Sequence, residues 1–172
     1  MPRCFVRDAR HDRRLVAAAA LSAALSLGSG QALAQRGGGP FAGLEGTWSG
    51  GGVVTMRDGG RERIRCRAEY DVGSAGRQLR QTLRCASDSY RFTLVGDIEA
   101  GEGGNLTGTW TEASRNAGGR VTGRATDGRI RGMIEGTGFS GAISVATRGD
   151  RQSVSLTSQQ QVRDVNISLR KR

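Results

Sequence analysis

Ten short runs in which apolar and polar residues alternate constrain the fold more than any other feature of the chain. They begin after Phe41, are separated by glycine-rich segments, and leave no stretch with a convincing helical periodicity. The clearest turns are Asp58-Gly59-Gly60, Asp127-Gly128 and Gly149-Asp150, which are typical of tight hairpins. The pattern predicts an all-β protein with strands over residues 47–56, 61–71, 79–86, 89–98, 105–112, 119–126, 129–136, 140–147, 151–158 and 162–169.

Antiparallel pairing of successive runs places their apolar residues on one common face. In the hairpin formed by residues 61–71 and 79–86, Cys66 lies opposite Cys85. We expect a meander of about eight to ten strands that buries one face, and its closure into a barrel removes exposed edges. The other hairpins are expected to pair Trp48 with Tyr70, Tyr90 with Cys85, Val121 with Ile134, and Val145 with Val154.

Residues 1–34 have the pattern of a cleavable signal peptide. Five arginines lie within Met1–Arg14, the apolar run Leu15–Leu27 follows, and Ala32-Leu33-Ala34 is a cleavage pattern that leaves Gln35 as the new N-terminus. The apolar run is too short for a membrane span, which needs about 20 residues. We therefore expect a bacterial periplasmic or secreted protein with a flexible leader over residues 35–40 and a barrel domain over residues 41–172. The general secretory and twin-arginine routes both remain open.

The cysteine and histidine content limits the chemistry of the mature chain. Cys4 and His11 lie in the expected signal, so the mature chain keeps Cys66 and Cys85 and has no histidine. Because export leads to an oxidising compartment, we predict a Cys66–Cys85 disulfide. The lack of histidine excludes Ser-His-Asp and Cys-His sites and any zinc site that needs imidazole. We therefore expect a non-enzymatic protein without a metal or cofactor.

The chain is strongly basic, and arginine supplies nearly all of its positive charge. Removal of the expected signal takes five of the 26 basic and two of the 16 acidic residues, which leaves a net charge of +7. This charge favours anionic partners such as lipopolysaccharide or an acidic glycan. A solvated surface whose arginine content reflects codon composition is the alternative.

The expected register gathers several of these arginines on the outer face of the sheet. It sets Arg67 opposite Arg84 and Arg84 opposite Arg91, with Arg124 opposite Arg131 in a second pair. Like charges directly across a sheet cost stability, and the planar fork of arginine suits phosphate, sulfate and carboxylate groups. These five arginines are therefore the candidate anion-binding residues.

The segment Leu44-Glu45-Gly46-Thr47-Trp48, repeated in part by Gly108-Thr109-Trp110, resembles the Gly-x-Trp start of lipocalins, avidins and related calycin-type barrels. The resemblance implies a barrel with an apolar ligand cavity. It also implies that Trp48 closes one end beneath an arginine of the final strand, Arg163 or Arg170. The candidate barrel-end or cavity residues are Trp48, Trp110, Tyr70 and Phe92; simple core packing is the alternative for the two tryptophans.

Three functions are compatible with these features. The first is a non-enzymatic envelope protein whose basic outer face binds anionic envelope components. The second is a lipocalin-like carrier of a small apolar ligand, and the third is an inhibitor or accessory partner of another exported protein. A continuous cavity of about 300 Å³ or more favours the carrier, whereas a filled interior favours the surface binder.

Two partner classes are not expected. Proteins that bind single-stranded nucleic acid expose aromatic rings, whereas Tyr70, Tyr90 and Phe92 are predicted on the buried face. A membrane-spanning barrel needs an apolar outer face, whereas the outward side chains of residues 61–71 are mainly arginines, Arg63 and Arg65 among them. The chain is therefore not expected to span a membrane.

Overall fold

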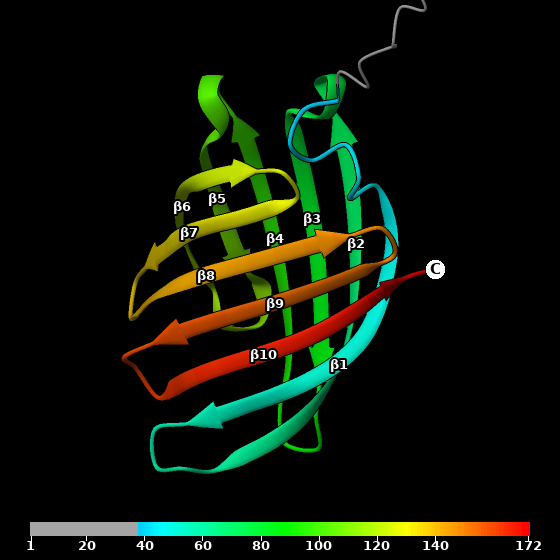
Figure 1. Cartoon of the computed structure of the whole chain (residues 1–172). Coiled ribbons are helices and arrows are strands. Elements are labelled where there is room, and N and C mark those ends of the chain that lie inside the picture. The colour runs from blue at the N-terminus through cyan, green and yellow to red at the C-terminus, as the bar shows by residue number, and fades with distance from the viewer. Residues whose placement is uncertain (1–37) are drawn as a thin grey trace, which may run out of the picture. The chain divides into compact units, whose positions relative to one another are not determined.

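Residues 38–172, described by a computed structural model, form one closed barrel of ten antiparallel strands in consecutive order, in which β1 pairs with both β2 and β10 (Figure 1). All ten expected strands are present, so the predicted all-β meander is confirmed. The expected signal peptide over residues 1–34 lies outside the described residues. The strands are β1 Gly46–Met56, β2 Arg61–Gly73, β3 Gln78–Ala86, β4 Arg91–Ala100, β5 Asn105–Glu112, β6 Ala117–Thr126, β7 Arg129–Gly136, β8 Phe139–Arg148, β9 Arg151–Ser158 and β10 Val162–Lys171, with 3₁₀ turns η1 Ser74–Gly76, η2 Glu102–Gly104 and η3 Ala113–Arg115.

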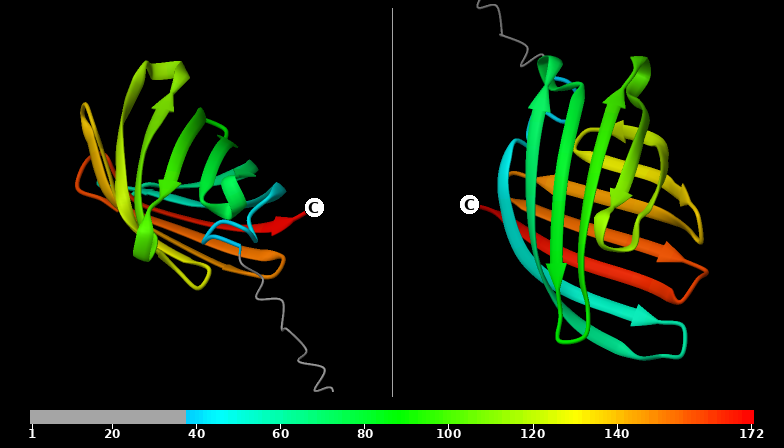
Figure 2. Two further views of the ribbon diagram at one scale, coloured as in Figure 1. Left: turned by 90° about the horizontal axis from the view of Figure 1, so that it is seen from above. Right: turned by 180° about the vertical axis from the view of Figure 1, so that it is seen from behind.

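The barrel has two walls whose strands run in different directions. Figure 1 shows β2, β3, β4 and β5 side by side behind β7, β8, β9, β10 and β1, which cross in front of them, and the reverse view in Figure 2 agrees. The alternation of buried and exposed residues along β2 shows that one face of each strand points inward. The interior therefore lies between the two walls.

Three of the five expected hairpin registers are confirmed. Cys66 lies opposite Cys85 between β2 and β3, and the two form a disulfide with Cα atoms 4.2 Å apart. The expected pairings also hold between β6 and β7 and between β8 and β9, with Val121 opposite Ile134 and Val145 opposite Val154.

The other two hairpin registers were predicted wrongly, each by two positions. Trp48 lies opposite Ala68 and not Tyr70, and Cys85 lies opposite Phe92 and not Tyr90. A slip of two positions keeps every side chain on its expected face, whereas a slip of one would turn the strand over. The fold prediction therefore survived both errors.

Turn geometry explains both slips. In the β1–β2 turn, Met56 N–H donates to the Gly60 carbonyl at 2.7 Å, and Gly60 N–H donates to Asp58 Oδ1 at 2.9 Å. In the β3–β4 turn, Ser87 N–H donates to the Tyr90 carbonyl at 2.8 Å. That turn is therefore centred one residue later than expected, and Tyr90 is 46 % exposed at its end and not buried beside Cys85.

The segment before β1 folds against one end of the barrel. Gly39 N–H donates to the Ala75 carbonyl at 2.7 Å, and Phe41 N–H donates to the Gly76 carbonyl at 3.0 Å. Phe41 is fully buried. Within the expected flexible leader over residues 35–40, the chain is therefore already fixed at Gly39, while residues 35–37 lie outside the described part. Between residues 38 and 172, no helix has the length and apolar character needed to cross a membrane.

Candidate functional site

The interior of the barrel holds a cavity of about 450 Å³, which lies within the usual range for small-molecule sites. Both walls contribute to it, and most of its lining is aliphatic or aromatic. The volume exceeds the 300 Å³ that separates a carrier from a filled barrel. Its apolar lining includes Leu44, Val54, Ile64, Leu83, Phe92, Leu94, Ile98, Leu106, Trp110, Val121, Ile130, Ile134, Phe139, Ile143, Val145, Val154, Leu156, Val165, Ile167 and Leu169.

One end of the cavity is closed by the segment that precedes β1. Leu44 lines the cavity, and its carbonyl accepts a hydrogen bond of 2.8 Å from Trp48 Nε1. Trp48 is fully buried. The cation over its ring is Lys171 of β10, with Nζ 5.7 Å from the ring centroid. The expectation of an arginine there is therefore wrong. Trp48 faces Lys171 across the β1–β10 seam, one position beyond Arg170, and neither candidate arginine, Arg163 nor Arg170, takes that place.

A buried chain of hydrogen bonds lies in the cavity wall near this closed end. The Tyr70 hydroxyl donates to Gln152 Oε1 at 2.7 Å, and Gln152 Nε2 donates to Thr147 Oγ1 at 3.1 Å. Burial raises the pKa of Tyr70 to about 12, and the bond to Gln152 opposes this shift in part. The phenol is therefore neutral at ordinary pH and fixed in orientation.

The opposite end of the cavity carries its charged side chains. Glu62, Tyr90, Arg115 and Gln161 line it there, beside the turns that follow β1, β3, β5 and β9. Glu62 Oε1 accepts a 2.9 Å hydrogen bond from Ser89 N–H. Hydrogen bonds from the β3–β4 turn lower the pKa of the Glu62 carboxyl. Tyr90, Arg115 and Gln161 are exposed to solvent, so this end forms the mouth of the cavity.

Glu112 joins β4, β5 and η3 at this mouth. It is buried, and its carboxylate accepts hydrogen bonds from Ser114 Oγ at 2.7 Å, Arg115 N–H at 2.8 Å and Thr93 N–H at 3.2 Å. Burial alone would raise the pKa of the Glu112 carboxyl, but these hydrogen bonds outweigh it and lower the pKa. The carboxylate therefore stays ionised, and its oxygens hold the turn to β4 by accepting these hydrogen bonds.

Two aromatic rings from opposite walls meet in the cavity. Trp110 of β5 and Phe139 of β8 lie edge to face with ring centroids 6.1 Å apart. Trp110 Nε1 donates to the Glu135 carbonyl at 3.3 Å. The candidate cavity residues thus divide: Trp110, Tyr70 and Phe92 line the cavity, whereas Trp48 packs behind its closed end.

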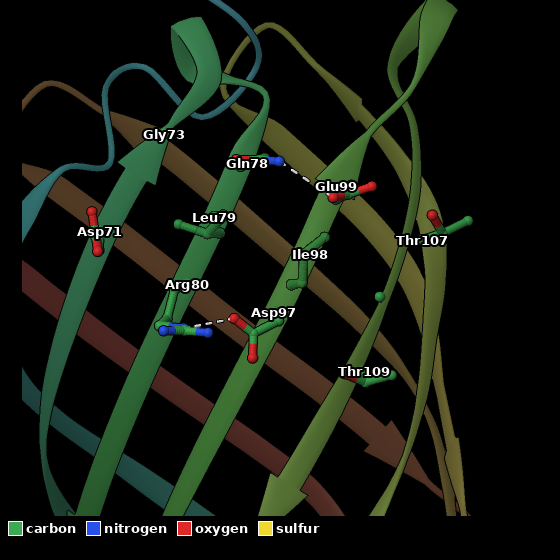
Figure 3. Close-up of a pocket in the computed structure, with 11 residues that line it drawn as sticks. Asp71, Gly73, Gln78, Leu79, Arg80, Asp97, Ile98, Glu99, Thr107 and Thr109 are labelled. Carbon is green, nitrogen blue, oxygen red and sulfur yellow. Dashed lines mark hydrogen bonds and ion pairs between the residues drawn. The ribbon is translucent and has the colours of Figure 1, made fainter.

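A second hollow of about 490 Å³ lies on the outer face of β2 to β5 (Figure 3). Two of its charged side chains form an ion pair, and a third accepts a hydrogen bond from an amide. Arg80 Nε donates to Asp97 Oδ1 at 2.7 Å, and Gln78 Nε2 donates to Glu99 Oε1 at 3.3 Å (Figure 3). The hollow is an open depression with polar walls, so the inner cavity is the better candidate for a ligand site.

The five candidate anion-binding arginines do not form the expected arrangement. Arg67 does lie opposite Arg84, and Arg124 opposite Arg131. Arg91, however, lies opposite Ala86, because the β3–β4 register differs by two positions. The expected row across β2, β3 and β4 is therefore wrong at Arg91.

Neighbouring groups already engage three of these arginines. Glu69 lies 3.4 Å from both Arg67 and Arg84. Arg124 donates to the Gly103 carbonyl and to Asn105 Oδ1, each at 3.0 Å. Since these contacts are exposed, they stabilise the fold little and leave the guanidinium groups accessible.

Sequence reasoning missed the inward polar residues. Gln152 stands at an inward position of the run 151–158, where an apolar residue was expected, and this mismatch is a signal for a buried hydrogen bond. Glu112 precedes Ala-Ser-Arg, and a carboxylate directly before a turn is a typical cap. Among residues 38–172, no group of three or more Cys, His, Asp or Glu side chains is arranged to hold a metal.

Together the fold and the cavity define a closed ten-stranded antiparallel β-barrel with an internal space of ligand size. No protein-family model matches the chain, and no curated protein matches it. Among solved structures, it is similar to Rv2717c from M. tuberculosis, with a TM-score of 0.59 and 15 % identity over 76 % of this chain and 94 % of that one.

Among solved structures, a lyase and a designed barrel also match the chain. The S-type phycobiliprotein lyase CPES from Guillardia theta has a TM-score of 0.52 and 12 % identity over 77 % of this chain and 89 % of that one. A de novo designed fluorescence-activating β-barrel has a TM-score of 0.46 and 14 % identity over 77 % of this chain and 96 % of that one. The likeness to Rv2717c and to the lyase shows the barrel fold alone.

Proposed function

We propose that the protein is a non-enzymatic binder or carrier of a small, largely apolar molecule held inside the barrel. The single observation that carries this proposal is the cavity of about 450 Å³ with a predominantly apolar lining. Pockets of this size and character are typical of sites that bury most of a small ligand. The structural neighbours support the fold only, so the proposal rests on the cavity itself.

The distribution of polar groups defines the shape of a suitable ligand. At the closed end, the polar side chains form hydrogen bonds with one another: Tyr70 with Gln152, and Gln152 with Thr147. Because they need no further partner, that end favours an apolar part of the ligand. Glu62 and Arg115 lie at the mouth, where a polar part remains in contact with water. A ligand with one apolar and one polar end fits both.

The test compares two tryptophan substitutions on β8. Ile143 lines the cavity, whereas Ser144 next to it is exposed. Ile143→Trp fills the cavity and Ser144→Trp does not, while both add the same ring. Titration with an apolar fluorescent dye should show binding to the native protein and to Ser144→Trp, and at least about tenfold weaker binding to Ile143→Trp. Equal dye binding by all three proteins, with circular dichroism showing intact folds, would overturn the proposal.

Native mass spectrometry provides an independent check. The protein, purified under native conditions, should carry a small apolar ligand, and Ile143→Trp should carry none.

The same measurement tests the disulfide, which lowers the mass by two hydrogens. It also tests export: a mature chain beginning at Gln35 is expected after cleavage at Ala34, in a periplasmic or secreted protein. The disulfide supports that location.

A second proposed function is the binding of an anionic envelope component, such as lipopolysaccharide or an acidic glycan, by the basic outer face. The directly opposed pairs Arg67–Arg84 and Arg124–Arg131 favour it, because like charges across a sheet cost stability unless a partner neutralises them. Arg84→Glu should weaken lipopolysaccharide binding. Unchanged affinity in Arg84→Glu would argue against a role for this residue.

A further inference from the structure

The strand registers place five arginines and one serine in a continuous row across six neighbouring strands on the outside of the barrel. The row crosses the β1–β10 seam at Ser49, where Arg170 lies opposite on one side and Arg67 on the other. Arg172 donates a hydrogen bond from Nε to Ser49 Oγ and so brings a guanidinium group to this one neutral position. The row, called here the arginine belt, consists of Arg148, Arg151, Arg170, Ser49, Arg67 and Arg84 on β8, β9, β10, β1, β2 and β3, with Arg172.

Few acidic groups neutralise the arginine belt. Glu69 contacts Arg67 and Arg84, and Asp150 lies 3.8 Å from Arg170. Within residues 38–172, no ion pair joins Arg148 or Arg151 to a carboxylate. All five arginines of the row are exposed. The repulsion between directly opposed guanidinium groups is therefore left for a bound anion to relieve.

A track of small side chains runs beside the belt on β8, β9, β10 and β1, two positions further along each of these four strands. Ser153 lies opposite both Ala146 and Ser168, and Ser168 lies opposite Gly51. From Ala146 to Gly51 no side chain of this track is larger than serine, and Arg65, opposite Gly51 on β2, ends it. A polymer chain therefore has room to lie on these four strands. The serine hydroxyls can exchange hydrogen bonds with hydroxyl groups of a ligand.

We propose that the arginine belt binds a linear anionic polysaccharide, which lies on the small-residue track and pairs its charged groups with the belt. This inference deepens the second proposed function, on which it rests, and is independent of the cavity. Adjacent strands are about 4.8 Å apart, so the six strands extend about 24 Å along the sheet. A single sugar or an isolated anion therefore reaches only a small part of the belt.

Shape favours a flexible chain over a flat surface. The belt follows strands that pass from the front of the barrel, at β8, β9, β10 and β1, to β2 and β3 on the other wall (Figures 1 and 2). A flat membrane touches only part of such a convex row, whereas a polymer can follow it. Among the described residues, the exposed large apolar side chains are Tyr90 and Met133, and neither lies in the belt. The belt therefore lacks the aromatic rings on which nucleotide bases stack.

The test compares two pairs of exposed arginines. Arg151 and Arg170 belong to the belt, whereas Arg57 and Arg61 lie at the β1–β2 turn outside it. The variants R151E/R170E and R57E/R61E change the net charge equally. A fluorescently labelled dodecasaccharide of galacturonic acid should bind the native protein and R57E/R61E with similar affinity. R151E/R170E should bind it at least about tenfold more weakly.

Several results would overturn the proposal. Equal losses of dodecasaccharide affinity in both double variants would show attraction by net charge alone. A monomer of galacturonic acid that binds as tightly as the dodecasaccharide would show that no chain is recognised. Binding of phosphatidylglycerol vesicles or single-stranded DNA without binding of the dodecasaccharide assigns the belt to another partner. If the native protein binds none of these probes and no lipopolysaccharide, the second proposed function fails as well. Should R151E/R170E fold poorly by circular dichroism, R151Q/R170Q makes the same comparison.

Discussion

Tyr70 shows at the scale of one residue how the barrel combines an apolar cavity with a fixed polar group. Its hydroxyl donates to Gln152 inside the protein, and its ring lies edge to face with Trp48 at 6.3 Å between centroids. Tyr70→Phe leaves Gln152 Oε1 without this donor, and we expect a loss of about 1–3 kcal/mol in the free energy of unfolding. Urea denaturation at neutral pH measures this loss. An unchanged midpoint would show that the buried bond is not needed.

The same residue predicts a dependence of stability on alkaline pH. The pKa of Tyr70 rises from 10.0 to about 12 on folding because burial disfavours the phenolate. The folded state therefore holds this proton more tightly than the unfolded state, and its contribution to stability is complete below pH 10. It is lost as the pH rises from 10 towards 12. Phenolate absorbance should show a step near pH 12 in the native protein, and Tyr70→Phe should lack it.

At the scale of single elements, Glu112 is the cap that fixes η3 to β4 at the cavity mouth. The pKa of its carboxyl is lowered from 4.5 by hydrogen bonds that outweigh burial. Its stabilising effect is therefore present above pH 4.5 and lost as the pH falls through the lower value of the folded state. Glu112→Gln should cost about 1–3 kcal/mol at neutral pH, because the amide group cannot accept every bond of the carboxylate.

Thermal denaturation from pH 3 to pH 7 tests the role of Glu112. The difference between the native protein and Glu112→Gln should shrink as the pH falls. Glu102→Gln, an exposed position on η2, is the control and should change little. A difference that stays constant over this range would show that the charge of Glu112 is not what stabilises the turn.

The β2–β3 hairpin is stabilised covalently. The Cys66–Cys85 disulfide joins residues separated by 19 positions, and closing such a loop in the unfolded chain is worth about 3 kcal/mol in the chain-entropy model. The double variant Cys66→Ser/Cys85→Ser should lose this amount in urea denaturation. The native protein in a reducing agent should lose a similar amount, and resistance of both to destabilisation would contradict the prediction.

The hairpins also show what the sequence could and could not determine. Opposed cysteines and the short Asp127-Gly128 turn leave little freedom, and those registers were predicted correctly. The turns around Asp58 and Ser87 allow more than one arrangement, and their hydrogen bonds shift the pairing by two positions. The face on which a side chain lies depends only on the alternation along its strand, so most of the buried residues could be predicted. The residue opposite Arg91 depends on the turn and could not.

At the scale of the whole molecule, the features most relevant to function arise from barrel closure. The cavity needs both walls, and its volume depends on side chains from every part of the barrel. The arginine belt needs the β1–β10 seam, where Ser49 lies opposite Arg170. No hairpin turn determines the register of that seam, because its strands are the first and last of the barrel. The sequence alone therefore predicted Arg67 and Arg84 side by side but not the continuation of the row across the seam to Arg170 and Arg151.

The seam itself rests on a close approach between β1 and β10. A Cβ atom at Gly52 would collide with the carbonyl group of Asn166, and one at Gly50 with that of Ser168. Gly52→Ala should therefore weaken the pairing that closes the barrel, with a loss of about 1–3 kcal/mol in the free energy of unfolding. Gly43→Ala is the matched control, because a Cβ atom there meets nothing within 4 Å.

Hydrogen exchange separates a closure effect from a local one. If the seam holds the barrel together, Gly52→Ala should speed amide exchange in both β1 and β10, which lie at opposite ends of the sequence. It should also weaken dye binding in the cavity, since the two walls would no longer be held at a fixed distance. Faster exchange confined to the residues next to Gly52, with full dye binding, would show that the cavity and the belt depend on the individual hairpins and not on closure.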